Sequence, residues 1–72
     1  MESYKNLSGT SNIAGYDIGP DYIRVAFFGT SRVYTYSYRK AGSTHVERMK
    51  QLARDGSGLN SYINKYVKQA YD

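Results

Sequence analysis

Few side chains in this sequence are suited to catalysis, and those few lack partners. His45 is the only histidine, and there is no cysteine. We expect His45 in the first turn of a helix, where the helix dipole disfavours a cationic imidazole. No acid stands at a spacing useful for acid–base or metal chemistry. Asp17 and Asp21 flank a Gly-Pro turn, and a calcium site would need many more oxygen ligands. The sequence therefore predicts a protein that is not an enzyme and holds no metal or cofactor.

Cationic and aromatic residues are more informative, because their alternation is typical of surfaces that stack unpaired bases. Arg24 stands between Tyr22 and Phe28 on one face of an expected strand. Further cations and amides follow the expected hairpin and line an expected C-terminal helix, where they are suited to contacts with phosphates, sugars or bases. The candidate nucleic-acid-binding residues are Tyr22, Arg24, Phe28, Arg39, Lys40, Asn64, Lys65 and Lys68.

Each of these residues also has a plain structural explanation. The row from Tyr22 to Phe28 fits a solvated strand face or a dimer interface at least as well, and Arg39-Lys40 fits a solvated loop. Tyr34 and Tyr36 fit a base-stacking platform, but they share a face with apolar residues. Packing beneath a helix is therefore the favoured interpretation of this tyrosine pair.

The element expected to position these residues is a β-hairpin over residues 22–38, YIRVAFFGTSRVYTYSY. Its alternation breaks at Gly29-Thr30, which suits a two-residue type II′ turn because glycine accepts a positive φ. This register pairs Val25 with Tyr34 and Ile23 with Tyr36. A four-residue loop would keep the same parity, whereas a three-residue loop would turn the tyrosines to the other face. The inward face would carry Ile23, Val25, Phe27, Tyr34 and Tyr36, and the outward face Tyr22, Arg24, Ala26, Phe28, Val33, Thr35 and Ser37.

The chain before the hairpin is expected to supply one more strand. Residues 1–10 are polar and predict a flexible N-terminal lead-in to a single domain over residues 11–72. The segment from Ser11 to Asp17 predicts a short first strand, in which Gly15 marks a bulge or a close backbone approach. Residues 17–21 predict a turn, so that the three strands form an antiparallel meander.

Two amphipathic helices are expected after the hairpin. Thr44 and Glu47 match a capping box at the start of the first helix, and Asp55-Gly56 supplies its stop. Its inner side would carry Val46, Met49, Leu52 and Ala53, and its outer side Arg48, Lys50 and Arg54. The second helix, from Leu59 to about Tyr71, has a clear apolar stripe that would cover the inward face of the hairpin. The predicted fold is α+β, a three-stranded antiparallel β-meander followed by two α-helices packed on one sheet face.

Composition limits the partners and the compartment. The 72 residues carry a formal net charge of +4, with ten Lys and Arg against six Asp and Glu. A basic balance favours polyanionic partners, although mild basicity also serves solubility. Because the sequence has neither a long apolar segment nor a cysteine, we expect a soluble protein of the reducing cytoplasm with no membrane partner.

Several short motifs occur in an order that is known from a protein family. They are Ser11-Asn12-Ile13, Tyr16-Asp17, Val25-x-Phe27, Tyr34-x-Tyr36, Gly58-Leu59-Asn60, Tyr62-Ile63-Asn64, Val67-Lys68 and Tyr71. Over roughly residues 8–71 this pattern resembles the KTSC domain, named after a C-terminal appendage of some lysyl-tRNA synthetases and also found as small stand-alone bacterial and phage proteins. The chain departs from the family at residues 39–43, where the shorter form has a Val-Pro segment. The resemblance implies a β-meander followed by two helices, an RNA-binding role and no catalytic residues.

Two hypotheses of function follow. The favoured one is a non-enzymatic module that weakly binds RNA or single-stranded nucleic acid through a basic and aromatic surface. Duplex DNA is less expected, because no helix has the base-reading side chains of a recognition helix. The alternative is a protein-interaction module, which forms a homodimer or binds a partner through the exposed sheet face.

Overall fold

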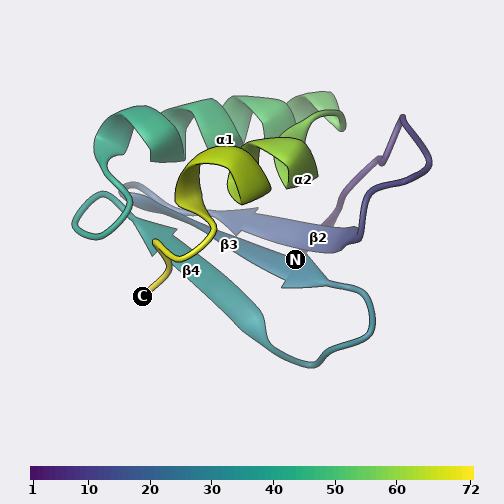
Figure 1. The fold of residues 1–72 in the computed structure, drawn as a ribbon, viewed down its shortest axis with the longest axis horizontal. Helices are drawn as coiled ribbons and strands as arrows, with labels where there is room; N and C mark the ends of the chain where they lie inside the picture. The colour runs from purple at the N-terminus through teal and green to yellow at the C-terminus, as the bar shows by residue number, and fades with distance from the viewer.

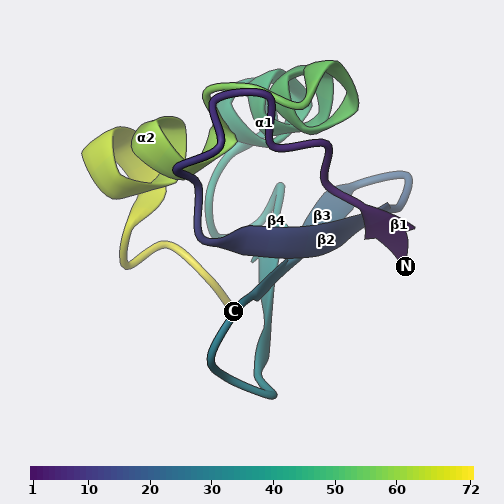
Figure 2. The ribbon, with the colours of Figure 1, turned by 90° about the vertical axis from the view of Figure 1, so that its right-hand side faces the viewer.

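Four antiparallel strands form one open sheet in the computed structural model, which describes residues 1–72. The strands lie in chain order across the sheet and are β1 (Glu2–Ser3), β2 (Ile13–Ile18), β3 (Tyr22–Phe27) and β4 (Val33–Ser37). The helices lie together on one side of this sheet (Figures 1 and 2). The α+β class and the helices on one sheet face are therefore confirmed, whereas the predicted number of strands is one too low.

The additional strand lies within residues 1–10, the predicted N-terminal lead-in. β1 pairs with β2 through Glu2 with Tyr16 and Ser3 with Gly15. Glycine permits this pairing, because a Cβ at position 15 would lie 2.6 Å from the Glu2 carbonyl oxygen. Tyr4, which follows β1, is buried in the core. Two polar strand residues carry no alternating pattern, so the sequence gives no signal for this strand.

The β2–β3 pairing has the irregularity predicted at Gly15. The register shifts between Ile13 and Gly15, which is a β-bulge. The turn that follows β2 is closed by the Gly19 N–H group, which donates to the Tyr22 carbonyl at 3.0 Å. The bulge and the turn therefore lie where the glycines indicated.

The β3–β4 hairpin has the predicted register but not the predicted turn. Val25 pairs with Tyr34 and Ile23 with Tyr36, and the ladder ends at Ala26 and Val33. Residues 28–32 form a wider loop in place of a two-residue turn. Gly29 still takes the expected positive φ, 83°. The parity is kept, so both tyrosines remain on the helix side of the sheet.

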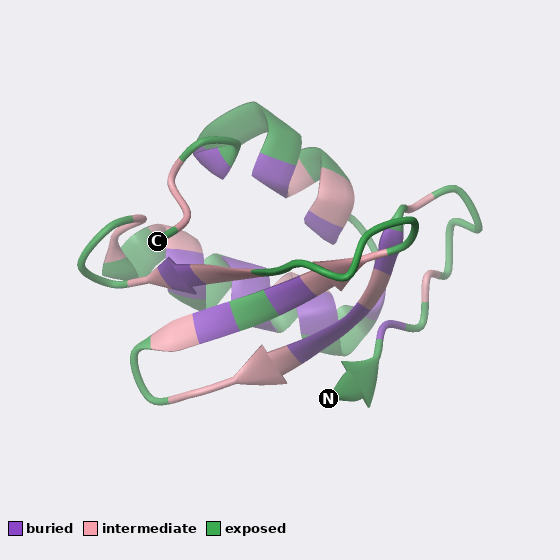
Figure 3. Cartoon of the chain, turned by 90° about the horizontal axis from the view of Figure 1, so that it is seen from below, coloured by how far each residue is buried: buried purple, intermediate pink, exposed green.

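The core lies between the sheet and the helices. From the sheet it takes Ile13, Tyr16, Ile23, Val25 and Tyr36, and from the helices Val46, Met49, Ala53, Leu59, Ile63 and Val67. Along β3, buried residues alternate with exposed or half-buried ones (Figure 3). The face of the sheet away from the helices is left uncovered (Figure 2).

The first helix, α1 (Ser43–Asp55), differs from the prediction at its start and on its outer side. The predicted capping box is wrong, because the N-cap is Gly42 and no side chain caps the helix. Glu47 instead pairs with Lys50 at 2.7 Å and accepts a hydrogen bond from the Tyr38 hydroxyl. Lys50, predicted to face outward, is only 5% exposed. The predicted stop is confirmed, since Gly56 is left-handed with φ of 78°.

The second helix is shorter and less regular than predicted. It begins as α2 (Leu59–Tyr62) and continues as η1 (Ile63–Val67), a π-helical segment. Its wider i→i+5 turns keep residues four apart on the buried side, namely Leu59, Ile63 and Val67. Tyr66 leaves the predicted apolar stripe and is 52% exposed. Helical structure also stops before Tyr71, and the Asp72 N–H group donates to the Thr35 carbonyl at 2.7 Å.

No helix in the chain has both the length and the apolar character needed to cross a membrane.

Candidate nucleic-acid interface

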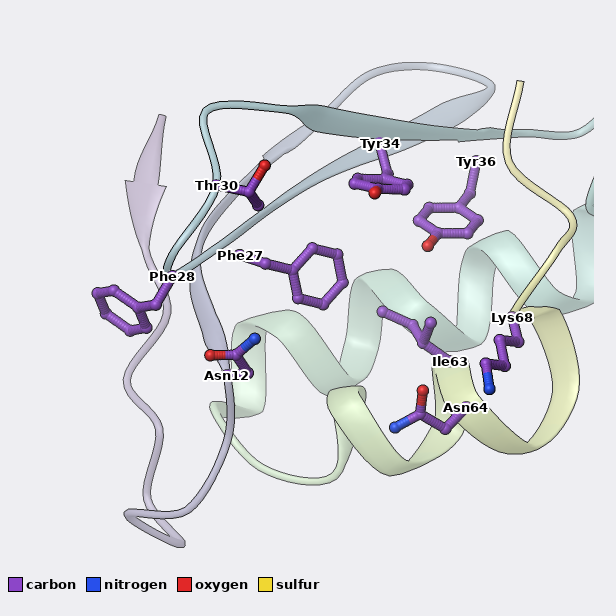
Figure 4. Close-up of a pocket in the computed structure, with 9 residues that line it drawn as sticks. All are labelled: Asn12, Phe27, Phe28, Thr30, Tyr34, Tyr36, Ile63, Asn64 and Lys68. Carbon is purple, nitrogen blue, oxygen red and sulfur yellow. The ribbon is translucent and has the colours of Figure 1, made fainter.

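A pocket of about 280 Å³ opens between the tip of the β3–β4 hairpin and the α2–η1 segment (Figure 4). We call it the aromatic pocket. It is lined by Asn12, Phe27, Phe28, Thr30, Tyr34, Tyr36, Ile63, Asn64 and Lys68. Aromatic rings from the sheet lie on one side of it, and Ile63, Asn64 and Lys68 lie on the other. The pocket therefore combines a stacking surface with an amide and an ammonium group.

Mutual ring packing holds the aromatic side of the pocket in place. Phe27 and Tyr34 meet edge to face, with ring centres 5.5 Å apart and planes at 89°. Tyr71 packs against Tyr34 in the same manner at 4.8 Å. Edge-to-face pairs are the favoured arrangement of aromatic rings. The Arg32 guanidinium lies over the Tyr34 ring, 5.0 Å from its centre, which adds a cation beside the pocket.

Tyr36 forms the most deeply buried wall of the pocket. The residue is only 1% exposed, yet it lines the cavity and its hydroxyl points into it (Figure 4). No group of the chain makes a hydrogen bond to this hydroxyl, and it is not sealed off from the cavity. Burial, followed by the neighbouring Tyr34 and Tyr71, raises the pKa of Tyr36 to about 12. The hydroxyl therefore keeps its proton at neutral pH and remains able to donate.

Three of the predicted residues meet at the aromatic pocket. Asn64 and Lys68 project from η1 and the turn after it, and Phe28 stands at the outer rim beside the hairpin loop (Figure 4). Phe28 is 59% exposed. Because β3 ends at Phe27, Phe28 does not continue the row of Tyr22 and Arg24 as predicted. The structure thus separates Phe28 from the two residues with which the sequence grouped it.

Tyr22 and Arg24 lie apart from this pocket. The Arg24 guanidinium lies 5.1 Å from the centre of the Tyr22 ring. Tyr22 also packs tightly over Gly19, where an added Cβ would lie 2.1 Å from the tyrosine ring. Arg24 is cross-strand from Thr35 on the outward face. These two residues form a small cation–aromatic patch of their own.

Arg39 and Lys40 lie at a third place, just beyond β4. They line a separate hollow of about 360 Å³ together with Ser37 and Asp72. The Ser37 hydroxyl donates to the Asp72 carboxylate at 2.8 Å. Because this carboxylate shares the hollow with the two cations, it weakens their attraction for a phosphate.

The Lys65 side chain lies against an aromatic cluster on the helix surface. Its ammonium lies 5.3 Å from the centre of the Tyr66 ring. Tyr66 stacks on His45 at 5.7 Å, and His45 Nδ1 shares a hydrogen bond of 2.7 Å with the Tyr62 hydroxyl. His45 is therefore held between α1 and the second helix, as part of a packed cluster.

Sequence reasoning missed much of the pocket lining. Asn12 and Thr30 carried no pattern that marked them, since both belong to irregular segments. Tyr34 and Phe27 were assigned to the covered face, and the structure leaves both half-buried. The only signal that pointed to them was the tyrosine pair, which fits a stacking platform. Both members line the pocket, but they differ in exposure, because Tyr36 is buried and Tyr34 is half-buried.

The chain matches no protein-family model, no curated protein and no solved structure. The resemblance to the KTSC domain therefore stays a prediction.

Proposed function

We propose that this chain is a non-enzymatic module that binds an unpaired segment of RNA or single-stranded nucleic acid at the aromatic pocket. The observation that best supports it is the grouping of an exposed Phe28 with Tyr34, Asn64 and Lys68 around one cavity. No other part of the chain brings aromatic, amide and cationic side chains together around a cavity.

The chemistry of a single strand suits this surface. Unpaired bases stack on aromatic rings whatever their sequence, and each stacked base contributes about 1–3 kcal/mol. Phe28 is an exposed aromatic residue at the rim of the pocket and provides such a platform. Lys68 on one side of the pocket and Arg32 on the other supply positive charge for the phosphates. A net charge of +4 adds a general attraction for polyanions.

Binding should weaken as salt rises, because each phosphate contact releases condensed counterions. If Arg32, Lys65 and Lys68 neutralise about three phosphates, the slope of log affinity against log salt is near −2. Affinity then falls roughly 15- to 20-fold between 50 and 200 mM salt.

Fluorescence anisotropy with a labelled mixed-sequence strand, measured at both salt concentrations, tests the proposal. The double variant Lys65→Gln/Lys68→Gln should flatten the slope by about 1 to 1.5 units. The matched control Arg48→Gln/Arg54→Gln removes the same charge from exposed positions of α1 and should leave the slope near the wild-type value. Phe28→Ala should lower the affinity by about 1–3 kcal/mol without changing the slope. No binding at 50 mM salt, or binding that none of these variants alters, would overturn the proposal.

A second candidate function is self-association through the uncovered sheet face. Val33 is 46% exposed on β4 and stands opposite Ala26 of β3, on a face that no helix covers. Burial of that face against a second copy would be weakened by a charge introduced on it. Val33→Lys should therefore turn a dimer into a folded monomer. Sedimentation of the wild-type chain as a monomer at millimolar concentration would remove this candidate.

A further inference from the structure

Two of the cations that were predicted to bind nucleic acid, Arg39 and Lys40, lie outside the aromatic pocket, in a hollow of their own. We infer that this hollow is a second phosphate-binding site, and that the Asp72 carboxylate occupies it in the unbound chain in place of a phosphate. The inference rests on the proposed function. It adds to that function a contact with the strand backbone and a group of the chain that opposes this contact.

The hollow has the composition of an anion site. Its four lining residues, Ser37, Arg39, Lys40 and Asp72, are all polar, and it is the only one of the three cavities that two cations line. Arg39 and Lys40 are exposed, and neither forms an ion pair within the chain. The Lys40 N–H group donates to the Ser37 hydroxyl oxygen at 3.2 Å, which holds the hydroxyl beside both cations. These groups are therefore free to donate hydrogen bonds to phosphate oxygens.

Asp72 is held in the hollow by contacts of its own backbone and side chain. Its N–H group donates to the Thr35 carbonyl at 2.7 Å, and its carboxylate accepts a hydrogen bond from the Ser37 hydroxyl at 2.8 Å. The preceding Tyr71 packs its ring edge to face against Tyr34, with ring centres 4.8 Å apart. An anion of the chain therefore already lies among the groups that a phosphate would use.

The hollow follows the aromatic pocket along β4. Tyr34 and Tyr36 line the pocket, and Ser37, the next residue, begins the hollow. Residues 34–40 span at most about 20 Å, whereas small folds that bind single strands contact about 4–16 nucleotides. One strand bound at the pocket is therefore long enough to bring a phosphate to the hollow.

The Asp72 carboxylate opposes this phosphate in two ways. It takes the hydrogen bond of the Ser37 hydroxyl, and its negative charge both repels a phosphate and reduces the attraction of the two cations. Asp72→Asn keeps the size of the side chain and removes the charge. The variant should bind the labelled strand at least roughly fivefold more tightly at 50 mM salt, because one or two further phosphates are neutralised. For the same reason the salt slope should become steeper by about 0.7 to 1.4 units.

Two comparisons separate a local site from a general change of charge. Asp55→Asn removes one negative charge from the exposed end of α1 and should leave the salt slope at the wild-type value. Arg39→Gln/Lys40→Gln should flatten the slope of Asp72→Asn by about 0.7 to 1.4 units. The same pair of substitutions should flatten the slope of the wild type by less than half as much, because the cations and the carboxylate act on the same phosphate.

Inorganic phosphate tests the hollow without a strand. Amide NMR titration at constant ionic strength should give saturable shifts at Ser37 and Lys40 in Asp72→Asn, and clearly smaller shifts in the wild type at the same phosphate concentration. Equal slopes and affinities for Asp72→Asn and Asp55→Asn, or no such shifts in Asp72→Asn, would overturn the inference and leave strand binding at the aromatic pocket standing. Failure of every protein to bind the strand would overturn the proposed function, and the phosphate titration would still decide whether the hollow binds an anion.

Discussion

Tyr34 and Tyr36 lie two residues apart on the same face of β4 but meet different surroundings. Tyr36 is sealed beneath the helices except at its hydroxyl, while the Tyr34 ring lies half-exposed between Phe27 and Tyr71. The strand alternation predicts that the two share a face. It does not predict how far the helix reaches along that face, and this decides which ring is available to a ligand.

The burial of Tyr36 has a consequence for stability at high pH. Its pKa is raised from 10.0 to about 12, mainly by burial. The folded state therefore binds this proton more tightly than the unfolded state does. The resulting stability is fully present below pH 10 and is lost as the pH rises towards 12. Urea unfolding at several alkaline pH values should show a steeper loss of stability in the wild type than in Tyr36→Phe. An equal loss of stability with pH in the two proteins would contradict the raised pKa of Tyr36.

Two glycines with similar positive φ allow backbone strain to be separated from crowding. Gly29 has φ of 83° and no atom within 4 Å of an added Cβ, whereas an added Cβ at Gly56, with φ of 78°, would lie 2.5 Å from the Lys5 Cβ. Gly29→Ala should cost about 1–2 kcal/mol from the left-handed conformation alone. Gly56→Ala should cost clearly more, since Lys5 or the helix end must also move. Equal unfolding free energies of the two variants in urea would show that the N-terminal segment does not pack there.

At the scale of the elements, η1 is held to the sheet by its buried side chains. Ile63 is a core residue of this segment, and Ile63→Ala should destabilise the fold by about 2–5 kcal/mol through lost burial and a cavity. The free energy of unfolding of a domain of this size is only about 4–10 kcal/mol in total. Ser61→Ala, at an exposed position of α2, is the control. Thermal unfolding of Ile63→Ala within a degree or two of the wild type would contradict this packing.

A charge cluster joins α1 to the end of β4 and to the β2–β3 turn. Lys50 pairs with Glu47 and donates to the Pro20 carbonyl at 3.3 Å, while the Tyr38 hydroxyl donates to the same Glu47 carboxylate. Lys50, followed by Tyr38, holds the pKa of Glu47 below its usual value of 4.5. The stability from this carboxylate is therefore present above pH 4.5 and is lost as the pH falls through the lowered pKa.

Removal of the Lys50 ammonium should raise the pKa of Glu47. Lys50→Met keeps much of the buried aliphatic stem, and carboxyl NMR titration should show the Glu47 pKa rising towards its usual value. Lys65→Met, on the surface of η1, should leave the Glu47 titration unchanged. An unaltered Glu47 pKa in Lys50→Met would show that the pair is not formed in solution.

Some of these elements can be predicted from the sequence and others cannot, because only some of them leave a pattern in it. The hairpin register follows from period-two alternation because one face is buried, and the end of α1 follows from a glycine that accepts positive φ. β1 is paired by backbone hydrogen bonds between two polar residues and leaves no such pattern. The π-helical segment keeps a four-residue apolar spacing that also fits an ordinary helix, so its exposed Tyr66 could not be foreseen. The pocket depends on these irregular segments, and only its aromatic members carried a signal.

At the scale of the whole molecule, the cations are spread over several surfaces. Arg24 belongs to the outward sheet face, Arg39 and Lys40 to the hollow beside Asp72, and Lys68 to the aromatic pocket. The net charge alone therefore does not indicate where a strand binds. The aromatic pocket is distinguished by what surrounds its cation, because stacking and hydrogen-bonding groups stand within the same cavity.

Amide NMR mapping of the full chain with a short unlabelled mixed-sequence strand, at low salt, tests strand binding at the aromatic pocket most directly. We expect the largest shifts at Asn12, Phe28, Thr30, Asn64 and Lys68, with little change at Tyr22 and Arg24 on the outward face. Addition of salt to 200 mM should reduce these shifts at a fixed strand concentration. Shifts confined to the outward face around Arg24, or none at all, would contradict binding at this pocket.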